Sequence, residues 1–285
     1  MSTNTIVGWD GSLEADVALE WAVRRAEELD DGIILVDVED AGLPVPGQVI
    51  TPQMVAARHE AADRQAQRLS DEHPGLRVNT HIMAGDRVDE LRSFSRPDNL
   101  VVVGTGVRRG PRSRYHWSLG ARLATTARGA VAIIPALPDE ARSRVVVGID
   151  GSEVSLKAAR YAAREARRLG HELVVAHGWL DPLIAVSDMR MEGPLLGELE
   201  EEHRRMLDSV VDSLRSANPD LTISSSLVRD QVYYALAEPA RSASLLVLGT
   251  QQARGVDRFL LGSVSHTMIL HIETPTIVVA PECLI

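Results

Sequence analysis

Short apolar runs alternate with longer amphipathic stretches along the whole chain. The runs, four to eight residues rich in Val, Ile and Leu, predict buried strands, and the stretches between them repeat apolar residues at helical spacing. This alternation predicts an α/β fold, a parallel sheet with helices on both faces. The expected strands are 4–9, 32–38, 76–83, 98–103, 130–134, 144–149, 172–177, 221–228, 244–248 and 275–280, and the expected helices are 13–29, 52–72, 86–95, 117–128, 153–169, 197–216, 231–242 and 263–272.

Three motifs of the first half return in the second half in the same order. They are "TIVGWDGS" (5–12) and "VVVGIDGS" (145–152), "NLVVVGTG" (99–106) and "LLVLGTQ" (245–251), and "GAVAIIP" (129–135) and "PTIVVAP" (275–281). A repeat of this length indicates a duplicated domain rather than a solenoid. We therefore expect a first domain at 1–137, a linker at 138–143 and a second domain at 144–285, each with five parallel strands and about four helices.

The composition and the absence of certain motifs argue against several classes of function. The net charge of -10 argues against binding to nucleic acid or to an anionic membrane, both of which favour a basic surface. No apolar run approaches the length of a membrane span, and the start "MSTNTIVGWD" is not typical of a secretory signal, so we expect a cytoplasmic location. The histidines do not cluster, which predicts no metal site. The motif Gly-x4-Gly-Lys-[Ser/Thr] is absent, which excludes a P-loop NTPase.

Asp10 and Asp150 each follow the first predicted strand of their half, and Ser12 and Ser152 stand where a helix N-cap is expected. In open parallel sheets, ligands bind at the carboxyl ends of the strands, where the strand order reverses. The two aspartates are therefore candidates for contact with a ligand. Capping of the following helix is the alternative explanation for both the aspartates and the serines.

Together, "VGWDGS", "VGIDGS", the strands that end in Gly-Thr, and "LLGSVS" resemble the universal stress protein family, and two such domains would cover nearly all of the chain. The resemblance implies flavodoxin-like, doubly wound domains. It also implies an adenine nucleotide, ATP alone or with Mg²⁺. A Gly-x2-Gly-x9-Gly-[Ser/Thr] loop after the fourth strand would hold it, with the aspartate after the first strand and the backbone at the end of the second.

The resemblance assigns nucleotide-binding residues in both halves. They are Asp150, Gly249, Gly262, Ser263 and Ser265 in the second half and Asp10, Val38, Gly104 and Ser118 in the first, with His177 as a further candidate near the adenine. The second half keeps the spacing of the glycine loop but has Gln252 at its middle glycine. The first half has Val107 and Trp117 at two of the glycine positions.

A further family glycine, after the third strand, is Gly85 in the first half and is replaced by Asp230 in the second. A carboxylate there repels a triphosphate unless it faces away or helps to hold a metal. The run at 107–116 carries Arg108, Arg109, Arg112 and Arg114, and is either a solvated loop or a phosphate-binding one. The preserved spacing makes the second half the better candidate site.

These features predict a stress-responsive regulatory protein that binds an adenine nucleotide mainly in its second domain. We expect no catalytic residue and at most slow ATP hydrolysis. The alternatives are a nucleotide-free protein that acts through dimerisation, and an enzyme of the wider adenine-nucleotide group, for which the chain shows no extra substrate pocket. The strands 130–134 and 275–280 are expected sheet edges. The resemblance implies that they pair in a homodimer or in a pseudo-twofold arrangement of the two halves.

Overall fold

A computed structural model describes residues 4–40, 51–106, 119–136, 142–180, 194–251, 267–269 and 271–285. The chain divides into two units, the first made of residues 1–137 with 282–284 and the second of residues 138–281 with 285. Most of the expected linker, residues 138–141, lies outside the described residues.

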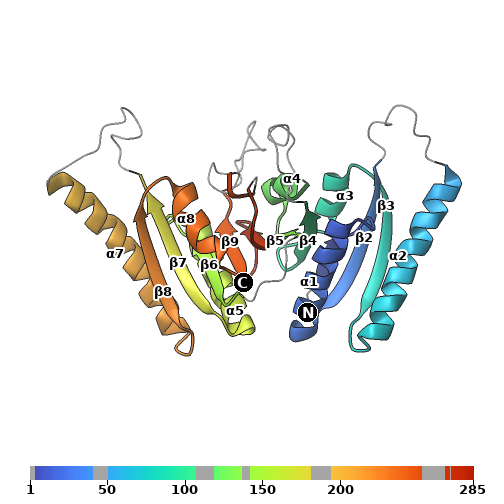
Figure 1. Ribbon diagram of the computed structural model, residues 1–285, viewed down its shortest axis with the longest axis horizontal. Helices are drawn as coiled ribbons and strands as arrows, with labels where there is room; N and C mark the ends of the chain where they lie inside the picture. Colours follow the sequence, from blue (N-terminus) through green and yellow to red (C-terminus); the bar gives the residue numbers. More distant parts are fainter. Residues whose placement is uncertain are drawn as a thin grey trace. The chain divides into compact units, whose positions relative to one another are not determined.

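In the first unit, the described strands form a parallel sheet in the order β3-β2-β1-β4-β5 (Figure 1). The strands are β1 (Asn4–Gly8), β2 (Gly32–Asp40), β3 (Val78–Gly85), β4 (Leu100–Thr105) and β5 (Ala130–Pro135), and the helices are α1 (Leu13–Leu29), α2 (Pro52–Glu72), α3 (Arg87–Ser93) and α4 (Leu119–Thr126). The order of the strands reverses between β1 and β4, which makes their carboxyl ends the switch point of this sheet.

The second unit repeats this arrangement with the strand order β8-β7-β6-β9-β10. Its strands are β6 (Arg144–Gly148), β7 (Glu172–Trp179), β8 (Ile223–Arg229), β9 (Leu245–Gly249) and β10 (Thr276–Val279), and its helices are α5 (Glu153–Leu169), α7 (Pro194–Ala217) and α8 (Val232–Arg241), with residues 267–269 also helical. The switch point lies between β6 and β9.

The doubly wound α/β fold predicted from the sequence is confirmed. The order 3-2-1-4-5 within each sheet differs from the 2-1-3-4-5 of flavodoxin itself, although both are doubly wound and obey the same rule for ligand binding. Helices α1, α2 and α5 have the expected bounds. The third strand of the first unit is shifted by two residues, to Val78–Gly85, and the expected helices 117–128 and 263–272 lie partly outside the described residues.

The two long helices that follow the first strands begin in the same way. The Ser12 hydroxyl accepts the N–H of Ala15 at 3.3 Å, and the Ser152 hydroxyl accepts that of Ser155 at 3.3 Å, so both serines are N-caps. Before them, Gly11 and Gly151 have φ angles of 75° and 81°, in the left-handed region that favours glycine. The sequence Asp-Gly-Ser therefore builds the turn from strand into helix in both units.

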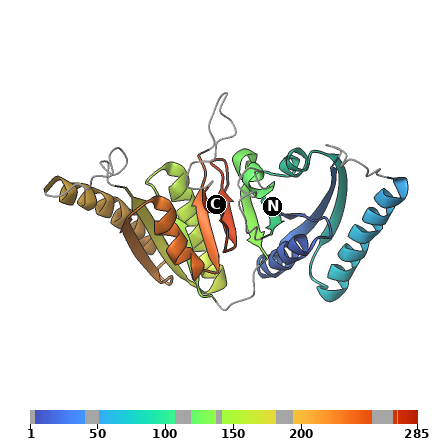
Figure 2. The same cartoon turned by 45° about the horizontal axis from the view of Figure 1, so that its top comes forward.

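Helices cover both faces of each sheet, as Figures 1 and 2 show for α7 and α8. His177 of β7 contacts α7, whereas a Cβ on the next residue, Gly178, would meet Ala235 of α8. Since successive side chains of a strand point to opposite faces, α7 and α8 cover opposite faces of β7. Within the described part of the chain, no helix combines the length and the apolar character needed to cross a bilayer.

Candidate functional site

The carboxyl ends of the two central strands bring the candidate aspartates and glycines together in each unit. In the first unit Asp10 follows β1, and Gly104 lies at the end of the neighbouring strand β4. In the second unit Asp150 follows β6, and Gly249 ends β9 beside it. These positions flank the switch point of each sheet, where a ligand of a doubly wound fold binds.

The two aspartates share one set of contacts. Oδ1 of Asp10 accepts the Ser12 hydroxyl at 2.6 Å and the Ser12 N–H at 3.1 Å. Oδ1 of Asp150 accepts the Ser152 hydroxyl at 2.6 Å and the Ser152 N–H at 3.0 Å. Through these contacts each aspartate orders the turn before the helix, and the units differ in the other partners of the carboxylate.

In the first unit, the second carboxylate oxygen of Asp10 is bound by an arginine. Nη1 of Arg87, the first residue of α3, donates to Oδ2 at 3.3 Å. Partial burial alone would raise the pKa of Asp10, but the Ser12 hydrogen bonds and the charges of Arg87 and Arg58 together lower it. Asp10 is therefore an anion that already has a cationic partner within its own unit.

In the second unit, no arginine pairs with Asp150 among the described residues. Burial would again raise the pKa of this carboxyl, and hydrogen bonds from Ser152 and Ser155 lower it below its usual value. The position of Arg87, the first residue of α3, is taken by Val232, the first residue of α8. An apolar side chain at that position cannot form the ion pair that Asp10 makes.

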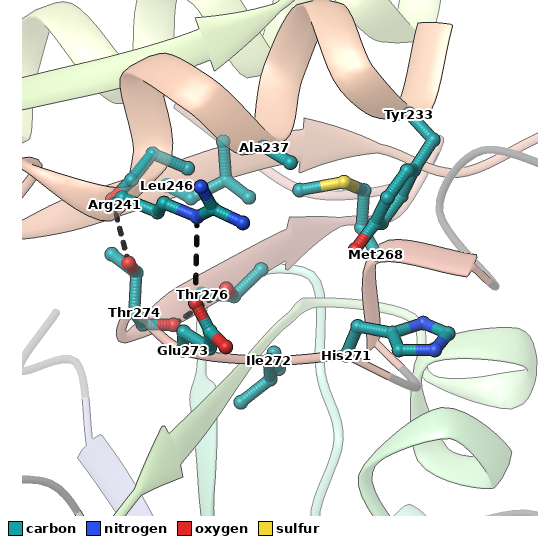
Figure 3. Close-up of a pocket in the computed structure, with 11 residues that line it drawn as sticks. Tyr233, Ala237, Arg241, Leu246, Met268, His271, Ile272, Glu273, Thr274 and Thr276 are labelled. Carbon is teal, nitrogen blue, oxygen red and sulfur yellow. Dashed lines mark hydrogen bonds and ion pairs between the residues drawn. The ribbon is translucent and has the colours of Figure 1, made fainter. Parts of the chain in front are cut away.

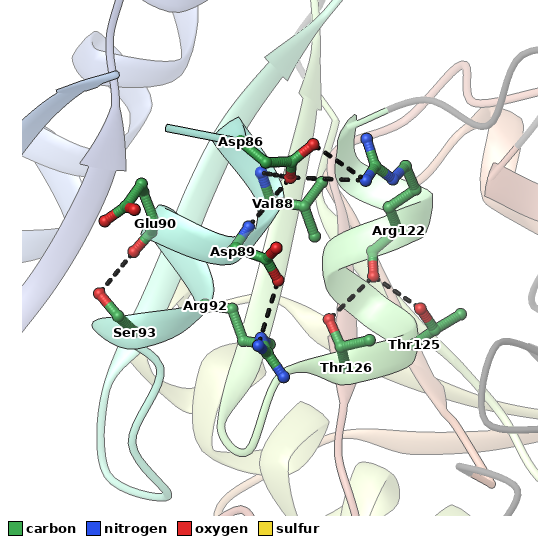
Figure 4. Close-up of polar contacts among 9 residues, drawn as sticks. All are labelled: Asp86, Val88, Asp89, Glu90, Arg92, Ser93, Arg122, Thr125 and Thr126. Atoms are coloured by element: carbon green, nitrogen blue, oxygen red, sulfur yellow. Dashed lines mark hydrogen bonds and ion pairs between the residues drawn. The ribbon is translucent and has the colours of Figure 1, made fainter. Parts of the chain in front are cut away.

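Arg122 of α4 makes a second ion pair at the edge of the first sheet (Figure 4). Its Nη2 lies 3.3 Å from Oδ2 of Asp86, the N-cap of α3, whose Oδ1 accepts the N–H groups of Val88 and Asp89 at 2.8 and 3.1 Å. Burial alone would raise the pKa of Asp86, but these N–H groups and Arg122 together lower it below its usual value. In the second unit the cap of α8 is Gln231, which makes no side-chain cap bond.

The ends of β2 and β7 carry a further difference between the units. In the first unit the buried carboxylate of Asp37 binds Arg58 of α2, with Nε of Arg58 3.1 Å from Oδ2. The strand register places His177 at the position of Asp37, and Nε2 of His177 lies 2.9 Å from Nδ1 of His203 on α7. A fixed-charge pair in the first unit therefore corresponds to a pair of histidines in the second.

The other candidates near the expected adenine position are placed by the same register. Val38 is buried in β2, and Gly178 occupies its position in β7. His177 is also buried, and its Nδ1 lies 2.8 Å from the carbonyl oxygen of Ile149, the residue before Asp150. The structure thus connects His177 to the turn that carries Asp150.

The candidate glycines have a packing role that sequence reasoning did not reveal. A Cβ on Gly104 would lie 2.0 Å from the carbonyl oxygen of Glu14, and one on Gly249 would lie 2.9 Å from that of Val154. Both carbonyls belong to the first turn of the helix that packs on the switch point. Glycine at these positions is therefore required for the close approach of strand and helix, whether or not a ligand binds.

Thr250, directly after Gly249, is a buried polar residue at the second switch point. Its side chain is 1% exposed, its N–H donates to the carbonyl of Val279 at 3.0 Å, and its hydroxyl has no hydrogen-bond partner among the described residues. A buried hydroxyl without a partner is uncommon and is satisfied most simply by a ligand or by water.

Part of the expected loop lies outside the described residues. Gly262, Ser263, Ser265 and Ser118, as well as Gln252, Val107, Trp117 and the arginines of 107–116, lie outside the described residues. Two other candidates are described. Gly85 has a φ of 156°, and the strand register places Asp230 at the same position of the second unit, where its Oδ1 accepts the N–H of Gln231 at 2.6 Å.

A separate small cavity lies in the second unit near the amino ends of β9 and β10, at the opposite end of the strands from Asp150 (Figure 3). Tyr233, Arg241, Met268 and Glu273 are among the residues around it, and its volume is about 40 Å³. That volume suits one or two water molecules rather than a nucleotide. Among the described residues, no group of three or more His, Cys, Asp or Glu side chains is arranged to hold a metal ion.

Sequence reasoning missed Arg58, Arg87 and His203. Each reaches the site from a helix that is distant in sequence from its partner, and no motif marks it. The only available signal was the comparison of equivalent positions in the two halves, where Arg58 becomes His203 and Arg87 becomes Val232.

Comparisons with known proteins agree with the duplication and the fold. The model of the Universal stress protein family matches residues 1–135 and again residues 141–280. A universal stress protein of Mycolicibacterium smegmatis is 34% identical over 295 residues, with 97% of each chain covered. One of Mycobacterium tuberculosis is 30% identical over 309 residues, with 96% of this chain and 93% of that protein covered.

Among solved structures, a universal stress protein from Archaeoglobus fulgidus aligns with 98% of this chain and 99% of its own, at a TM-score of 0.69 and 18% identity. A universal stress protein from Pseudomonas aeruginosa aligns with 99% of this chain and 94% of its own, at a TM-score of 0.67 and 14% identity. At these identities the structural likeness bears on the fold alone.

Proposed function

The chain belongs to the universal stress protein family, and we propose that it is a regulatory protein that binds an adenine nucleotide, ATP, mainly in its second unit. The observation that carries this proposal is the contrast between the two aspartates. Arg87 binds the second carboxylate oxygen of Asp10, whereas no described arginine binds that of Asp150. An oxygen that is not engaged by an internal cation is available to accept hydrogen bonds from the hydroxyls of a ribose.

The surroundings of Asp150 support a ligand at this edge. The hydroxyl of Thr250 is buried at the same switch point without a described partner, so a bound ligand or its water would satisfy it. Gly249 keeps the backbone beside Thr250 close to the first turn of α5, whose N-terminal end favours an anion. These features fit a nucleotide with its sugar near Asp150 and its phosphates towards the loop after β9.

Within this proposal each residue has a physical role. Asp150 orients the ribose, and Gly262, Ser263 and Ser265 donate N–H and hydroxyl groups to the phosphates, as the family motif implies. Mg²⁺, if it accompanies ATP, neutralises part of the phosphate charge near Asp230.

In the first unit the same edge supports a structural role. Asp10 with Arg87, Asp86 with Arg122 and Asp37 with Arg58 form three ion pairs around it. A nucleotide would have to separate Arg87 from Asp10 before Asp10 could bind a ribose. This observation favours a first unit that binds no nucleotide. The alternative hypothesis, a nucleotide-free protein that acts through dimerisation, would then apply to the first unit only.

We further propose that the units are domains at 1–137 and 144–285, joined by 138–143, in a cytoplasmic protein. The last strand of such a domain stands at the edge of its sheet, which favours pairing, either in a homodimer or between the two halves of one chain. Small-angle scattering from the purified protein tests whether the edge strands pair. A rigid particle is expected, and a monomer whose two units tumble freely would contradict it.

Two measurements test nucleotide binding itself. Chromatography of the supernatant after denaturation detects any nucleotide that co-purifies, and titration calorimetry with ATP, with and without Mg²⁺, gives the affinity. We expect binding that Gly262→Asp abolishes, because a carboxylate there repels the phosphates. No released nucleotide and no heat at millimolar ATP would overturn the proposal. Binding that survives Gly262→Asp would show that the second unit is not the site.

A further inference from the structure

Three ring side chains form a cluster at the carboxyl end of β7 in the second unit. Nε2 of His177 lies 2.9 Å from Nδ1 of His203 on α7, and the indole of Trp179 stacks on the His203 ring, with the centroids 4.8 Å apart and an angle of 23° between the planes. His177 and Trp179 are 6% and 3% exposed, and His203 is partly buried. The cluster is therefore part of the contact that holds α7 on the sheet.

The hydrogen bonds of the cluster determine where its protons are. Nδ1 of His177 lies 2.8 Å from the carbonyl oxygen of Ile149, and because a carbonyl oxygen only accepts, this nitrogen carries a proton. In the neutral pair, Nε2 of His177 then accepts the Nδ1–H of His203. A first added proton binds Nε2 of His203 and leaves both hydrogen bonds in place.

A second added proton breaks the contact between the two histidines. The nitrogen that would receive it is Nε2 of His177, which faces the Nδ1–H of His203. Two N–H groups cannot hydrogen-bond to each other, and two imidazolium rings with centroids 5.0 Å apart repel. When both histidines are charged, α7 therefore loses its hydrogen bond to β7.

The first unit joins the corresponding strand and helix with a different pair. The buried carboxylate of Asp37 on β2 binds Arg58 of α2, and the strand register places Asp37 at the position of His177. An arginine stays charged at every pH at which proteins fold, and neither side chain of this pair is a histidine. The first unit therefore has no group at this place that gains a positive charge in mild acid.

The surroundings of His203 determine the direction in which acid acts. Burial lowers the pKa of His203 below its usual 6.5, the neighbouring His177 lowers it further, and Glu202 on the same helix raises it. Because the pKa is lower in the folded chain than in the unfolded chain, the stability that neutral His203 contributes is complete above the unfolded value. This stability is lost as the pH falls from there towards the folded pKa.

Other charged groups lie on each element around the cluster. Arg229 of β8 lies over the Trp179 ring at 5.8 Å and adds positive charge, whereas Asp150 follows Ile149 in the turn after β6. On α7 itself, Glu200 and Arg204 bind each other at 2.9 Å. Neither a second cation on the pair nor Arg229 has a closer anion than Asp150 and Glu202 among these groups, so acid accumulates positive charge here.

We propose that the His177–His203 pair is a pH switch, which holds α7 on β7 when it is neutral and releases α7 in the second unit as the pH falls. The first unit, with Asp37 and Arg58, keeps its helix in place over the same range. The switch requires no bound ligand, so this response to acid is independent of the proposed nucleotide binding.

Release of α7 also changes the turn that carries Asp150. A Cβ on Gly151 would lie 3.5 Å from Met206, which is one helical turn after His203, so α7 covers this turn. The carbonyl of Ile149, the residue before Asp150, accepts the hydrogen bond of His177. Acid is therefore expected to loosen the edge of the second sheet as well as the helix.

The expected effect follows from the distance between the two rings. Two like unit charges 5.0 Å apart, in surroundings between protein interior and water, change an equilibrium constant by about tenfold or more. We expect the equilibrium constant for opening of α7 to rise by about tenfold or more between about pH 7.5 and about pH 4.5. Opening of α2 should change much less.

Hydrogen exchange of the nucleotide-free full chain, corrected for the intrinsic effect of pH, compares α7 with α2. His203→Gln keeps a hydrogen-bonding side chain and removes the titrating nitrogen. His271→Gln is the matched control, because it removes an exposed histidine of the same unit that lies outside the cluster. We expect wild type and His271→Gln to lose protection of α7 in acid by about tenfold or more, and His203→Gln to retain it.

A measurement on the wild-type protein alone guards against a variant that does not fold. Nuclear magnetic resonance of the imidazole nitrogens follows the protonation of His177 and His203 during the same titration. We expect a proton on Nδ1 of both rings at neutral pH, and both rings to become charged as α7 loses protection. Equal loss of protection in α2 and α7, equal pH dependence in wild type and folded His203→Gln, or opening of α7 while both rings are neutral would overturn the proposal. None of these results depends on nucleotide binding.

Discussion

Replacing the two switch-point glycines by alanine separates a packing role from a ligand role. A Cβ at position 104 would lie 2.0 Å from the carbonyl oxygen of Glu14 and 2.4 Å from its carbonyl carbon, so the first turn of α1 would have to move by about 1 Å. The obstacle is the backbone of a packed helix, which cannot rotate away. We expect Gly104→Ala to destabilise the first unit by about 3 kcal/mol, the upper end of typical overpacking costs.

The corresponding change in the second unit is milder. The Cβ of Gly249→Ala would lie 2.9 Å from the carbonyl oxygen of Val154, and a shift of roughly 0.5 Å would relieve the contact. We expect a cost of about 1 kcal/mol. In a domain of this size, these values correspond to about 10 °C and about 4 °C in melting temperature.

Differential scanning calorimetry of the nucleotide-free full-length variants measures both effects. Hydrogen exchange at the amides of β4 and β9 identifies which unit has lost stability. We expect a larger loss for Gly104→Ala, confined to the first unit. If both variants melt within about 1 °C of wild type in the absence of nucleotide, the glycines have no packing role and the reasoning is wrong.

Three further changes have expected outcomes. Arg58→Ala leaves the buried carboxylate of Asp37 without its guanidinium and should cost about 2 kcal/mol in urea unfolding, whereas Arg64→Ala, which removes an exposed pair, should cost less than about 0.5. Ser152→Ala removes the N-cap of α5 and should cost about 1 kcal/mol by the same measurement. The pKa of Asp86 is lower in the folded state than its unfolded value near 3.8, so its stabilising contribution is complete above the unfolded pKa and is lost as the pH falls through the folded pKa. We therefore expect Asp86→Asn to reduce the fall in melting temperature at acid pH. A fall as steep as that of the wild type would contradict the assignment.

Most of the fold could be predicted from local patterns. The strand that ends in "VGWDGS" or "VGIDGS" and the helix after it were predicted because apolar runs, Gly with positive φ and a capping serine act within a few residues. The bounds of the third strand of the first unit were predicted two residues too early because its residues are not fully buried (His81 is exposed and Met83 is partly buried) and its sequence does not alternate clearly between apolar and polar residues. An edge strand of this kind is positioned by its register with β2 rather than by its own sequence.

The candidate site could be predicted only in part. Asp10 and Asp150 were found because they follow a strand at an edge that the fold makes functional. The partners that distinguish them could not be found. The pairing of Asp10 with Arg87 depends on how α3 packs beside β1, and that of His177 with His203 depends on which face of α7 meets β7. Gly104 and Gly249 were assigned only to nucleotide binding because sequence cannot distinguish a close approach to a helix from a close approach to a ligand.

The central claim is that the second unit holds the nucleotide because Asp150 lacks the arginine that binds Asp10. Calorimetric titration with ATP of Asp150→Asn and Asp10→Asn, a matched pair that keeps the capping oxygen, tests it most directly. The account predicts one ATP per wild-type chain, binding weakened about tenfold or more by Asp150→Asn, and little change with Asp10→Asn. Loss of binding with Asp10→Asn and normal binding with Asp150→Asn would contradict it.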